Sequence, residues 1–308
     1  MRFINLKTRV ETSSIDVPTV LCIGDFDGVH LGHRQLVASV LDKHNHLKNQ
    51  YSALASGAWF FDSNSYKAAR EIYTIEEKLN VFASLGLDYA IIAEFDEMKS
   101  LPPETFVNEV LQIGCKCVHA VCGENFRFGA KAAGDSNMLK KLMNQNATVV
   151  PLLVLDDATV ISSTYIRTLL AEGDIQKANY LLGEYYTICE TVIHGKALGR
   201  TLGIPTINQN IQGKQFILKN GIYATLCTVD GIKYHGVTNL GLRPTVDDDG
   251  HKNIETHIID FNEDCYGKNV KIEFVSRIRD EIKFESVEAL KCQIQRDVQS
   301  AKDYFQNN

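Results

Sequence analysis

The sequence predicts an α/β domain with a parallel sheet, followed by a domain of antiparallel strands that ends in a helix. Two patterns support this fold class. Between residues 18 and 155, apolar runs of strand length alternate with runs at helical spacing, which is typical of a parallel sheet covered by helices. From about residue 185, short strand-like runs are separated by turn signals such as Asp230-Gly231, which indicates an antiparallel sheet or a small barrel.

The first domain alternates strands and helices in a regular order. The predicted strands are residues 19–24, 52–60, 89–94, 117–122 and 147–155, and the predicted helices between them are 32–44, 74–86, 103–113 and 135–145. Thr74 to Glu77 form a capping-box pattern at the start of the second helix, and Pro102 and Pro103 fit the first turn of the third. Because such sheets bind ligands beyond the carboxyl ends of their strands, we expect the functional site at that edge.

The most informative segment is residues 20–36, where a strand, a glycine-rich loop and His30-Leu31-Gly32-His33 precede a helix. A helix N-terminus offers free N–H donors and the positive end of the helix dipole to a phosphate. Two imidazoles there can donate to phosphate oxygens and stabilise developing charge. The alternative is a turn that merely contains two histidines. A nucleotide site is favoured by the residues around them, namely Gly24, Phe26, Asp27, Gly28 and Gly32.

A second polar segment, Ser162-Ser163-Thr164-Tyr165-Ile166-Arg167, opens a helical stretch that runs to about Leu182. Taken alone, this segment is an ordinary helix N-cap. Gly183-Glu184 follows it, and we place the domain boundary there, which gives domains 1–183 and 184–308. The second domain has predicted strands at 186–193, 216–229, 232–239, 254–261 and 269–276, and a terminal helix from about 286 to 304.

Composition limits the classes of partner. A formal net charge of −6 and a pI near 5.9 argue against a nucleic-acid binder and against a regulator with a basic DNA-reading element. No apolar run approaches the length of a membrane span and the N-terminus shows no secretory signal, so we expect a cytoplasmic protein. The eight cysteines lack metal-ligand spacing, and we expect them to be reduced and structural. The acidic run 247–249 is expected to be a solvated loop rather than a metal site.

Motifs in both halves resemble those of the bacterial bifunctional riboflavin kinase/FAD synthetases, over essentially the whole chain. The first half carries Gly24 to His33, Phe126-Arg127-Phe128-Gly129 with Gly134-Asp135, and the Ile161 to Arg167 segment. The second half carries His194-Gly195, Gly199 to Asn208, Gly221-Ile222-Tyr223, Gly236 to Thr245 and Glu255 to Phe261. The combination of these motifs in this order is highly specific for that family.

The resemblance implies a Rossmann-like nucleotidylyltransferase domain and a six-stranded riboflavin kinase barrel with a terminal helix. It implies that the first domain transfers AMP from ATP to FMN and that the second phosphorylates riboflavin. ATP, riboflavin, FMN and FAD are then the substrates and products, and Mg²⁺ is the cofactor. We expect only small-molecule partners, and a monomer or a weak homo-oligomer.

For the kinase reaction, the resemblance implies that Glu255 is the catalytic carboxylate that acts as base on the ribityl hydroxyl. Thr206 and Asn208 are two apart on an extended segment and so point the same way; the resemblance assigns them to Mg²⁺ and phosphate. For Arg200, contact with a phosphate and an exposed surface position are equally consistent with the sequence. The residues implied to contact nucleotide or flavin in this domain are Gly195, Gly199, Arg200, Gly203, Pro205, Asn239 and Arg279.

For adenylyl transfer, the resemblance implies that His30 and His33 bind the ATP phosphates and stabilise the transition state. The segment Ser162, Ser163, Thr164 and Arg167 is implied to hold the triphosphate from the far side. Arg127 is expected either to contact the nucleotide or to stabilise its own loop.

Three positions depart from the family pattern. Asp25 replaces the usual asparagine, residues 58–64 lack the usual proline and histidine, and Ala132 replaces an arginine. A carboxylate near phosphates adds repulsion unless it is paired or carries a cation. These departures raise the hypothesis that the kinase is intact while FAD synthesis is weakened, altered in its acceptor or absent, with both activities as the main interpretation.

Overall fold

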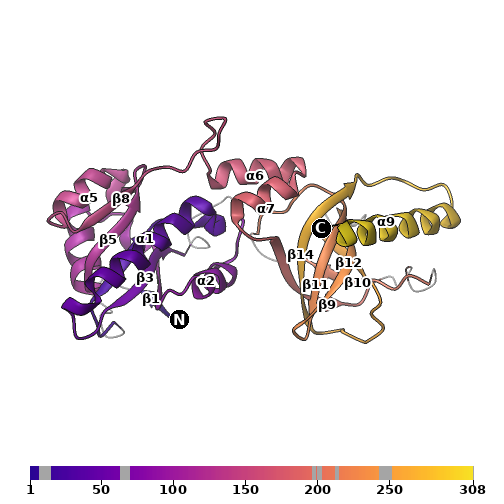
Figure 1. The fold of residues 1–308 in the computed structure, drawn as a ribbon, viewed down its shortest axis with the longest axis horizontal. Helices are drawn as coiled ribbons and strands as arrows, with labels where there is room; N and C mark the ends of the chain where they lie inside the picture. Colours follow the sequence, from indigo (N-terminus) through magenta and orange to yellow (C-terminus); the bar gives the residue numbers. More distant parts are fainter. Residues whose placement is uncertain are drawn as a thin grey trace. The chain divides into compact units, whose positions relative to one another are not determined.

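The computed structural model of the chain describes residues 1–6, 15–62, 70–195, 199, 203–211, 215–242 and 252–307. These residues form two compact units, Met1–Ser163 and Thr164–Asn308. The first unit holds a parallel sheet with helices, and the second holds a closed barrel, as Figure 1 shows. Within the part of the chain that is described, no helix is long and apolar enough to cross a membrane.

The sheet of the first unit has six parallel strands in the order β1-β4-β3-β2-β5-β8. The strands are β1 (Arg2–Leu6), β2 (Thr19–Ile23), β3 (Ala55–Phe61), β4 (Tyr89–Ala93), β5 (Cys117–Gly123) and β8 (Ala147–Val150). All of these were predicted from the sequence except β1, a short strand at the edge of the sheet that pairs with β4. The chain moves from β2 outward to β3 and β4 and then returns to the other side of β2 with β5. The carboxyl end of β2 is therefore at a topological switch point.

The connections of the first unit are mostly the predicted helices. They are η2 (Asp27–Val29), α1 (Leu31–Leu47), η3 (Lys48–Gln50), α2 (Ile75–Ser84), α3 (Phe95–Met98), α4 (Pro103–Thr105), η5 (Phe106–Gly114), η6 (Ala130–Ala132) and α5 (Ser136–Leu142). A small hairpin of β6 (Arg127–Phe128) and β7 (Gly134–Asp135) precedes α5. The predicted capping box is present, since the Thr74 hydroxyl accepts from the Glu77 N–H at 3.2 Å and Glu77 accepts from the Thr74 N–H at 2.7 Å. The predicted helix 103–113 is one α-turn followed by a π-helical stretch.

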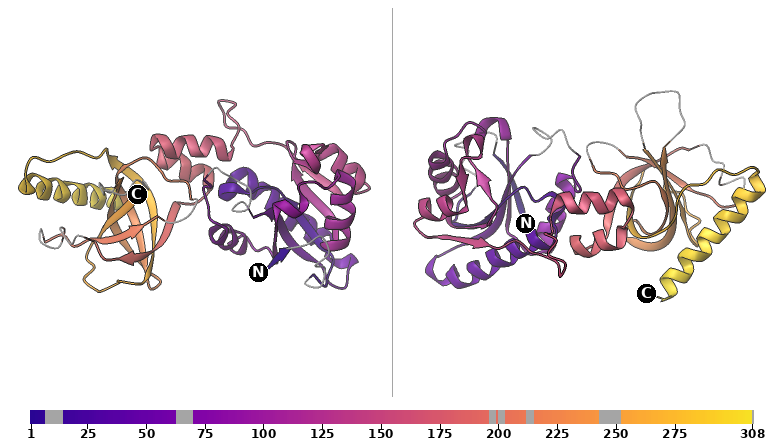
Figure 2. Two further views of the ribbon diagram at one scale, coloured as in Figure 1. Left: turned by 180° about the vertical axis from the view of Figure 1, so that it is seen from behind. Right: turned by 90° about the horizontal axis from the view of Figure 1, so that it is seen from above.

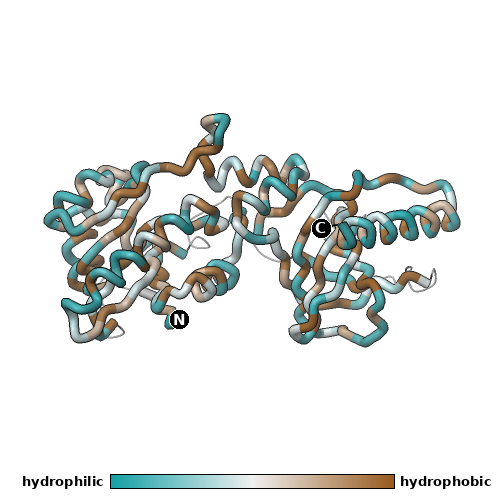
Figure 3. Tube along the Cα trace, in the orientation of Figure 1, coloured by the Kyte–Doolittle hydropathy of each residue, from teal (hydrophilic) through white to brown (hydrophobic). Residues whose placement is uncertain are grey.

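Apolar side chains fill both faces of the parallel sheet. Leu21 and Ile23 on β2 join a core with Phe106 of η5 and Leu139 of α5. The alternate face of β2 is covered by α1, which packs on β2, β3 and β5. Figure 2 shows α1 and α5 on opposite sides of the sheet, and Figure 3 shows the apolar residues gathered on its strands.

The second unit is a closed antiparallel barrel with the strand order β10-β13-β12-β11-β14-β9. Its strands are β9 (Tyr186–Ile193), β10 (Ile207–Asn210), β11 (Gly221–Val229), β12 (Ile232–Leu242), β13 (Lys252–Ile258) and β14 (Asn269–Arg279). The six strands match the barrel that the resemblance implied, and only β10 lacked a predicted strand run of its own. The acidic run 247–249 lies outside the described residues.

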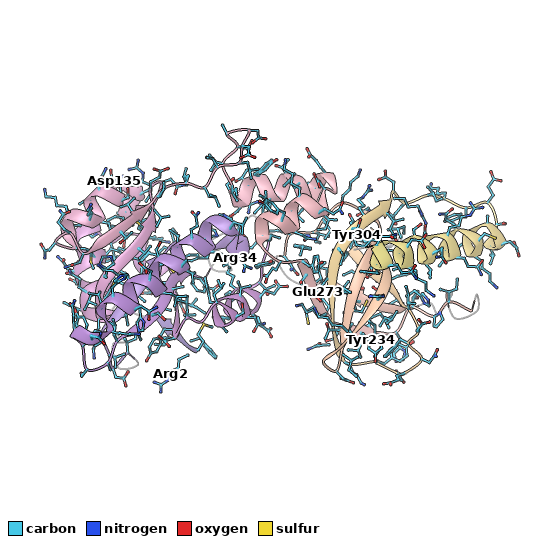
Figure 4. The ribbon with its side chains drawn as sticks, viewed as in Figure 1. Arg2, Arg34, Asp135, Tyr234, Glu273 and Tyr304 are labelled. Carbon is cyan, nitrogen blue, oxygen red and sulfur yellow. The ribbon has the colours of Figure 1, made fainter. Side chains whose placement is uncertain are left out.

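The helices α6, α7 and α9 belong to the barrel unit. The terminal helix α9 (Val287–Asn307) lies on β11, β12 and β14, where Ala301 meets Ile222 and Val237. Figure 4 labels Glu273 on the barrel and Tyr304 on α9. The helices α6 (Ser163–Glu172) and α7 (Ile175–Leu182) group with this unit, because the Asn179 amide of α7 donates to the Phe274 carbonyl at 2.8 Å. The domain boundary between residues 183 and 184 stays a prediction.

Candidate functional site

The loop after β2 has an unusual backbone. Phe26 and Val29 have φ values of 53° and 37°, and Gly28 has φ of 78°. Non-glycine residues rarely adopt this left-handed region, and a β-branched residue there is strained. Such strain is concentrated at ligand sites, and the loop delivers the chain to the N-terminus of α1 at the carboxyl edge of the sheet.

His30 and His33 form one stacked pair at the start of α1. Their ring centroids are 3.7 Å apart, and His30 Nδ1 accepts from the His33 N–H at 3.4 Å as the N-cap of the helix. Burial lowers the pKa of His30 to about 4, so its ring is neutral at pH 7. Since Nδ1 accepts, the proton is on Nε2, which leaves an N–H donor for a phosphate oxygen. A Cβ on Gly32 would lie 3.2 Å from the His30 ring, so a glycine suits this position.

Asp27 was predicted to contact the nucleotide, but its carboxylate faces the protein interior. Asp27 is 1% exposed and its Oδ1 accepts from the Ile72 N–H at 2.7 Å. The Ser163 hydroxyl donates to the Asp27 carbonyl at 2.8 Å. These bonds tie three distant segments together, so Asp27 helps to hold the loop after β2 in place.

The remaining predicted residues of adenylyl transfer are placed as follows. Arg127 forms an exposed ion pair with Asp135 across the β6–β7 hairpin, at 3.7 Å; this favours the loop-stabilising alternative for its resting position. Ser162 precedes α6. Thr164 and Arg167 belong to the second unit, where the Arg167 guanidinium donates to the Thr164 hydroxyl at 3.4 Å.

The three departures from the family pattern lie in different surroundings. Asp25 is exposed in the loop after β2. Ala132 is in the turn of the β6–β7 hairpin with φ of 56°. In the segment 58–64, Trp59 packs edge-on against Phe61 and Phe106, with ring centroids 4.8 and 5.1 Å apart; residues 63 and 64 lie outside the described residues.

In the barrel unit, glycines let the backbone approach Asn208 and Thr206. A Cβ on Gly195 would fall 2.4 Å from Asn208 Cγ. A Cβ on Gly199 would fall 2.4 Å from the Ile204 carbonyl oxygen and 3.3 Å from Thr206 Oγ1. Gly203, which lies between Gly199 and Thr206 in the sequence, has φ of 77°. Arg200 lies outside the described residues.

A cavity of about 170 Å³, here called the helix-side cavity, lies between the barrel and α9. It brings together predicted site residues from separate segments, and most of its other lining side chains are apolar, with His257, Glu281 and Asp297 as the polar ones. The predicted residues are Gly199, Thr206, Asn239, Glu255 and Arg279, and the others are Ile204, Ile222, Val237, His257, Glu281, Ile282, Phe284, Leu290, Ile294 and Asp297.

A second cavity of about 320 Å³, here called the loop-side cavity, lies beside the segment that follows β13. Pro205 and Thr206 line it together with Phe261, Asn262 and Tyr266. Thr206 therefore borders both cavities. The His257 ring bonds the Pro205 carbonyl at 2.8 Å, which holds this part of the chain against β13.

Glu255 lies at the centre of a row of polar side chains on the barrel. In the strand register it is opposite Asn208 on β10 and Asn239 on β12. Asn253, two residues earlier on the same strand, donates from Nδ2 to Glu255 Oε1 at 2.9 Å and to Asn208 Oδ1 at 3.5 Å. Asn253 was not predicted from the sequence, although its spacing from Glu255 places both side chains on one face.

Arg279 lines the helix-side cavity, and its guanidinium forms an ion pair with Asp297. Its guanidinium donates to both carboxylate oxygens of Asp297 on α9, at 2.8 and 2.6 Å. Gln293 also donates to Asp297, which is 3% exposed. The pair attaches α9 to β14, and Arg279 reaches a ligand only with its remaining N–H groups.

Comparisons with known proteins match both halves of the chain. The riboflavin kinase family model matches residues 182–305 and the FAD synthetase family model matches residues 12–165. The bifunctional riboflavin kinase/FMN adenylyltransferase of Bacillus subtilis is 35% identical over 94% of this chain and 93% of that protein. The Escherichia coli K12 protein of the same name is 33% identical over 93% and 92%.

One solved structure is similar over nearly the whole chain. It is the crystal structure of a protein named as a macrolide-efflux protein from Streptococcus pneumoniae. The TM-score is 0.87, with 25% identity over 98% of this chain and 99% of that one. The likeness therefore extends over both units.

Proposed function

This chain belongs to the family of bifunctional riboflavin kinase/FMN adenylyltransferases, and we propose that it phosphorylates riboflavin to FMN and then transfers AMP from ATP to FMN, forming FAD. The observation that carries the kinase is the helix-side cavity, where Glu255, Asn239 and Thr206 meet from separate strands and loops. The stacked histidines at the start of α1 support the second activity.

In the kinase reaction, riboflavin occupies the helix-side cavity. The apolar side chains of Val237, Phe284 and Leu290 receive the flavin ring, and Glu255 accepts the proton of the ribityl 5′-hydroxyl. The new bond joins that oxygen to the γ-phosphorus of ATP, while the bond to the β-phosphate oxygen breaks and ADP leaves. The protein contributes mainly position and charge neutralisation.

The nucleotide occupies the loop-side cavity, next to Phe261 and Tyr266. Since Thr206 borders both cavities, its hydroxyl marks where the γ-phosphate meets the flavin hydroxyl. The backbone N–H groups of Gly195 and Gly199 approach the phosphates because glycine has no Cβ. This assignment gives each cavity one substrate and leaves the reacting atoms between them.

The oxygen atoms around Thr206 fit Mg²⁺. Among the described residues, no cluster of three or more His, Cys, Asp or Glu side chains could hold a metal. The donor set here is instead the Thr206 hydroxyl and the Asn208 carboxamide oxygen, opposite Glu255 in register, which suits a hard cation that keeps several waters. When bound, Mg²⁺ neutralises charge on the transferring phosphate.

In the adenylyl transfer reaction, a phosphate oxygen of FMN attacks the α-phosphorus of ATP and pyrophosphate leaves. Neutral His30 donates from Nε2 to a phosphate oxygen, and the first N–H groups of α1 add donors there. Asp27 and Ser163 keep the loop in place, as their hydrogen bonds indicate.

We also propose that the chain acts as a monomer or a weak homo-oligomer, since each reaction is assigned residues of a single chain.

The test incubates the full chain with riboflavin, ATP and Mg²⁺ and separates the flavins by chromatography over time. FMN that appears first and FAD that follows would support both activities and show that Asp25 and Ala132 are tolerated. FMN without FAD, even from supplied FMN and ATP, would leave a kinase with a disabled first domain. Absence of FMN would overturn the proposal.

A further inference from the structure

Asn253 is a polar residue of the barrel that no predicted role includes. It is 6% exposed and lies on β13, opposite Asn210 on one side and Gly241 on the other. Side chains two apart on a strand share a face, so its carboxamide is next to Glu255. It does not line the helix-side cavity, and so any effect on substrate acts through a neighbour.

The carboxamide of Asn253 joins two groups of the proposed kinase site. Its Nδ2 donates to Glu255 Oε1 at 2.9 Å and lies 3.5 Å from Asn208 Oδ1. An NH₂ group has two protons and can serve both oxygens. Asn208 is held from its other side by the backbone of Gly195, where a Cβ would fall 2.4 Å from Asn208 Nδ2. The base and the metal ligand are thereby fixed relative to each other.

The carboxamide of Asn253 is oriented toward Glu255 and Asn208 rather than toward other polar groups of the barrel. Asn253 Oδ1 is buried and has no hydrogen-bond partner among the described residues, although buried polar atoms are nearly always paired. An amide placed only for packing would satisfy both of its ends. Here the donor end is engaged by Glu255 and Asn208, and the acceptor end is left unpaired among the described residues.

We infer that Asn253 is a positioning residue that fixes the Glu255 carboxylate and the Asn208 carboxamide in one geometry for riboflavin phosphorylation. The inference rests on the proposed kinase function. With Oε1 of Glu255 occupied by Asn253, Oε2 is the oxygen that receives the proton of the ribityl hydroxyl. The carboxamide oxygen of Asn208 is likewise kept aimed toward the cation position next to Thr206.

The first test is a double-mutant cycle in the full chain, with Asn253→Ala, Glu255→Gln and the double variant. We expect Asn253→Ala to lower kcat for FMN formation about 30-fold and to change KM for riboflavin less than threefold. At saturating Mg²⁺ and ATP, where the weakened support of Asn208 no longer limits the rate, the double variant will be no slower than Glu255→Gln alone. Losses that multiply in the double variant would overturn the inference.

Asn269 offers a matched control on the same barrel, since it is exposed at the start of β14 and accepts from the Thr191 hydroxyl at 2.7 Å. Asn269→Ala should leave FMN formation unchanged. Asn253→Ser keeps a donor on a shorter side chain and should recover part of the lost kcat; it also serves if Asn253→Ala is poorly folded. Asn253→Ser as slow as Asn253→Ala, in a chain that melts like the wild type, would contradict the role.

The second test needs no turnover. ADP binding is measured by calorimetry with and without Mg²⁺. We expect Asn253→Ala to weaken ADP binding about fivefold with Mg²⁺ and to leave it unchanged without Mg²⁺, because Asn208 loses its support. Equal weakening in both conditions, or none, would overturn the inference. A wild-type chain that makes no FMN defeats the proposed function, whereas this binding comparison still decides the role of Asn253.

Discussion

The two units of the chain position their candidate phosphate-binding groups by different means. In the first, a strained loop turns Asp27 inward and leaves backbone N–H groups and the stacked ring of His30 at the start of a helix. In the second, regular strand register aligns Asn208, Glu255 and Asn239 side by side. The proposed first site therefore depends on backbone conformation, whereas the proposed second site depends on side chains that the two-residue repeat of a strand places on one face.

The largest expected effect separates the two sites at Glu255. Glu255→Gln keeps the shape and removes the base, so we expect FMN formation to fall about 10³-fold, within the range for general base catalysis. FAD formation from supplied FMN should be unchanged. Flavin chromatography on the full chain measures both rates, with Glu172→Gln, an exposed residue of α6, as the control.

A parallel loss of FAD formation from supplied FMN would contradict the separation, because it would show that Glu255 supports the whole chain rather than one reaction. A kinase rate within threefold of the wild type would remove Glu255 from the role of base.

The sequence predicted the barrel site more fully than the loop site, and the physical reason is the same difference. Thr206, Asn239, Glu255 and Arg279 were expected from motifs, and they line one cavity. The inward turn of Asp27 was not predictable, because it depends on the Ile72 N–H, far away in the chain. Asn253 was missed for a simpler reason, since a single asparagine in a strand carries no motif of its own.

The secondary structure shows the same limit. Strands with continuous apolar runs, such as β2 and β5, were predicted within a residue or two. The edge strand β1 and the short β10 were not predicted as strand runs, since pairing with distant segments rather than local pattern defines them. The π-helical stretch Phe106–Gly114 also has no signal distinct from that of an α-helix.

The loop site can be tested at His30. His30→Ala removes the Nε2 donor and the N-cap, and we expect FAD formation to fall about 10²-fold, as for loss of one transition-state donor. FMN formation should stay at the wild-type rate. The control is His46→Ala, an exposed position on the same helix whose side chain is 70% exposed. Equal losses in both reactions would show a defect of folding instead.

A smaller effect is expected where the barrel depends on close backbone approach. Gly195→Ala would place a Cβ 2.4 Å from Cγ and Nδ2 of Asn208, so Asn208 must shift. We expect kcat for FMN formation to fall about tenfold and the Mg²⁺ concentration for half-maximal rate to rise, since the metal ligand moves. An unchanged Mg²⁺ requirement would mean that Asn208 is not a ligand; FAD formation from FMN reports whether the variant is folded.

The smallest effect concerns acid stability, and it should distinguish the units without any substrate. Burial lowers the pKa of His30 to about 4, and burial together with the charge of Lys43 does the same for His119. The unfolded chain takes up these protons near pH 6.5 and the folded chain only near pH 4. The stability that they confer is therefore present above pH 6.5 and is lost as the pH falls toward 4, by roughly 2 kcal/mol for His30 between pH 7 and pH 5 and by less for His119, whose charge solvent screens in part.

Trp59 makes this measurable, because it is the single tryptophan of the chain and lies buried in the first unit. Urea unfolding followed by its fluorescence should show a midpoint that drops from pH 7 to pH 5. His119→Gln, which keeps a partner for the Thr148 hydroxyl that His119 contacts at 2.9 Å, should reduce that drop by less than half, whereas the exposed His46→Gln should not reduce it. A drop of equal size in all three chains would assign the acid sensitivity to groups other than the buried histidines, and the contrast between the two units would then rest on the kinetic variants alone.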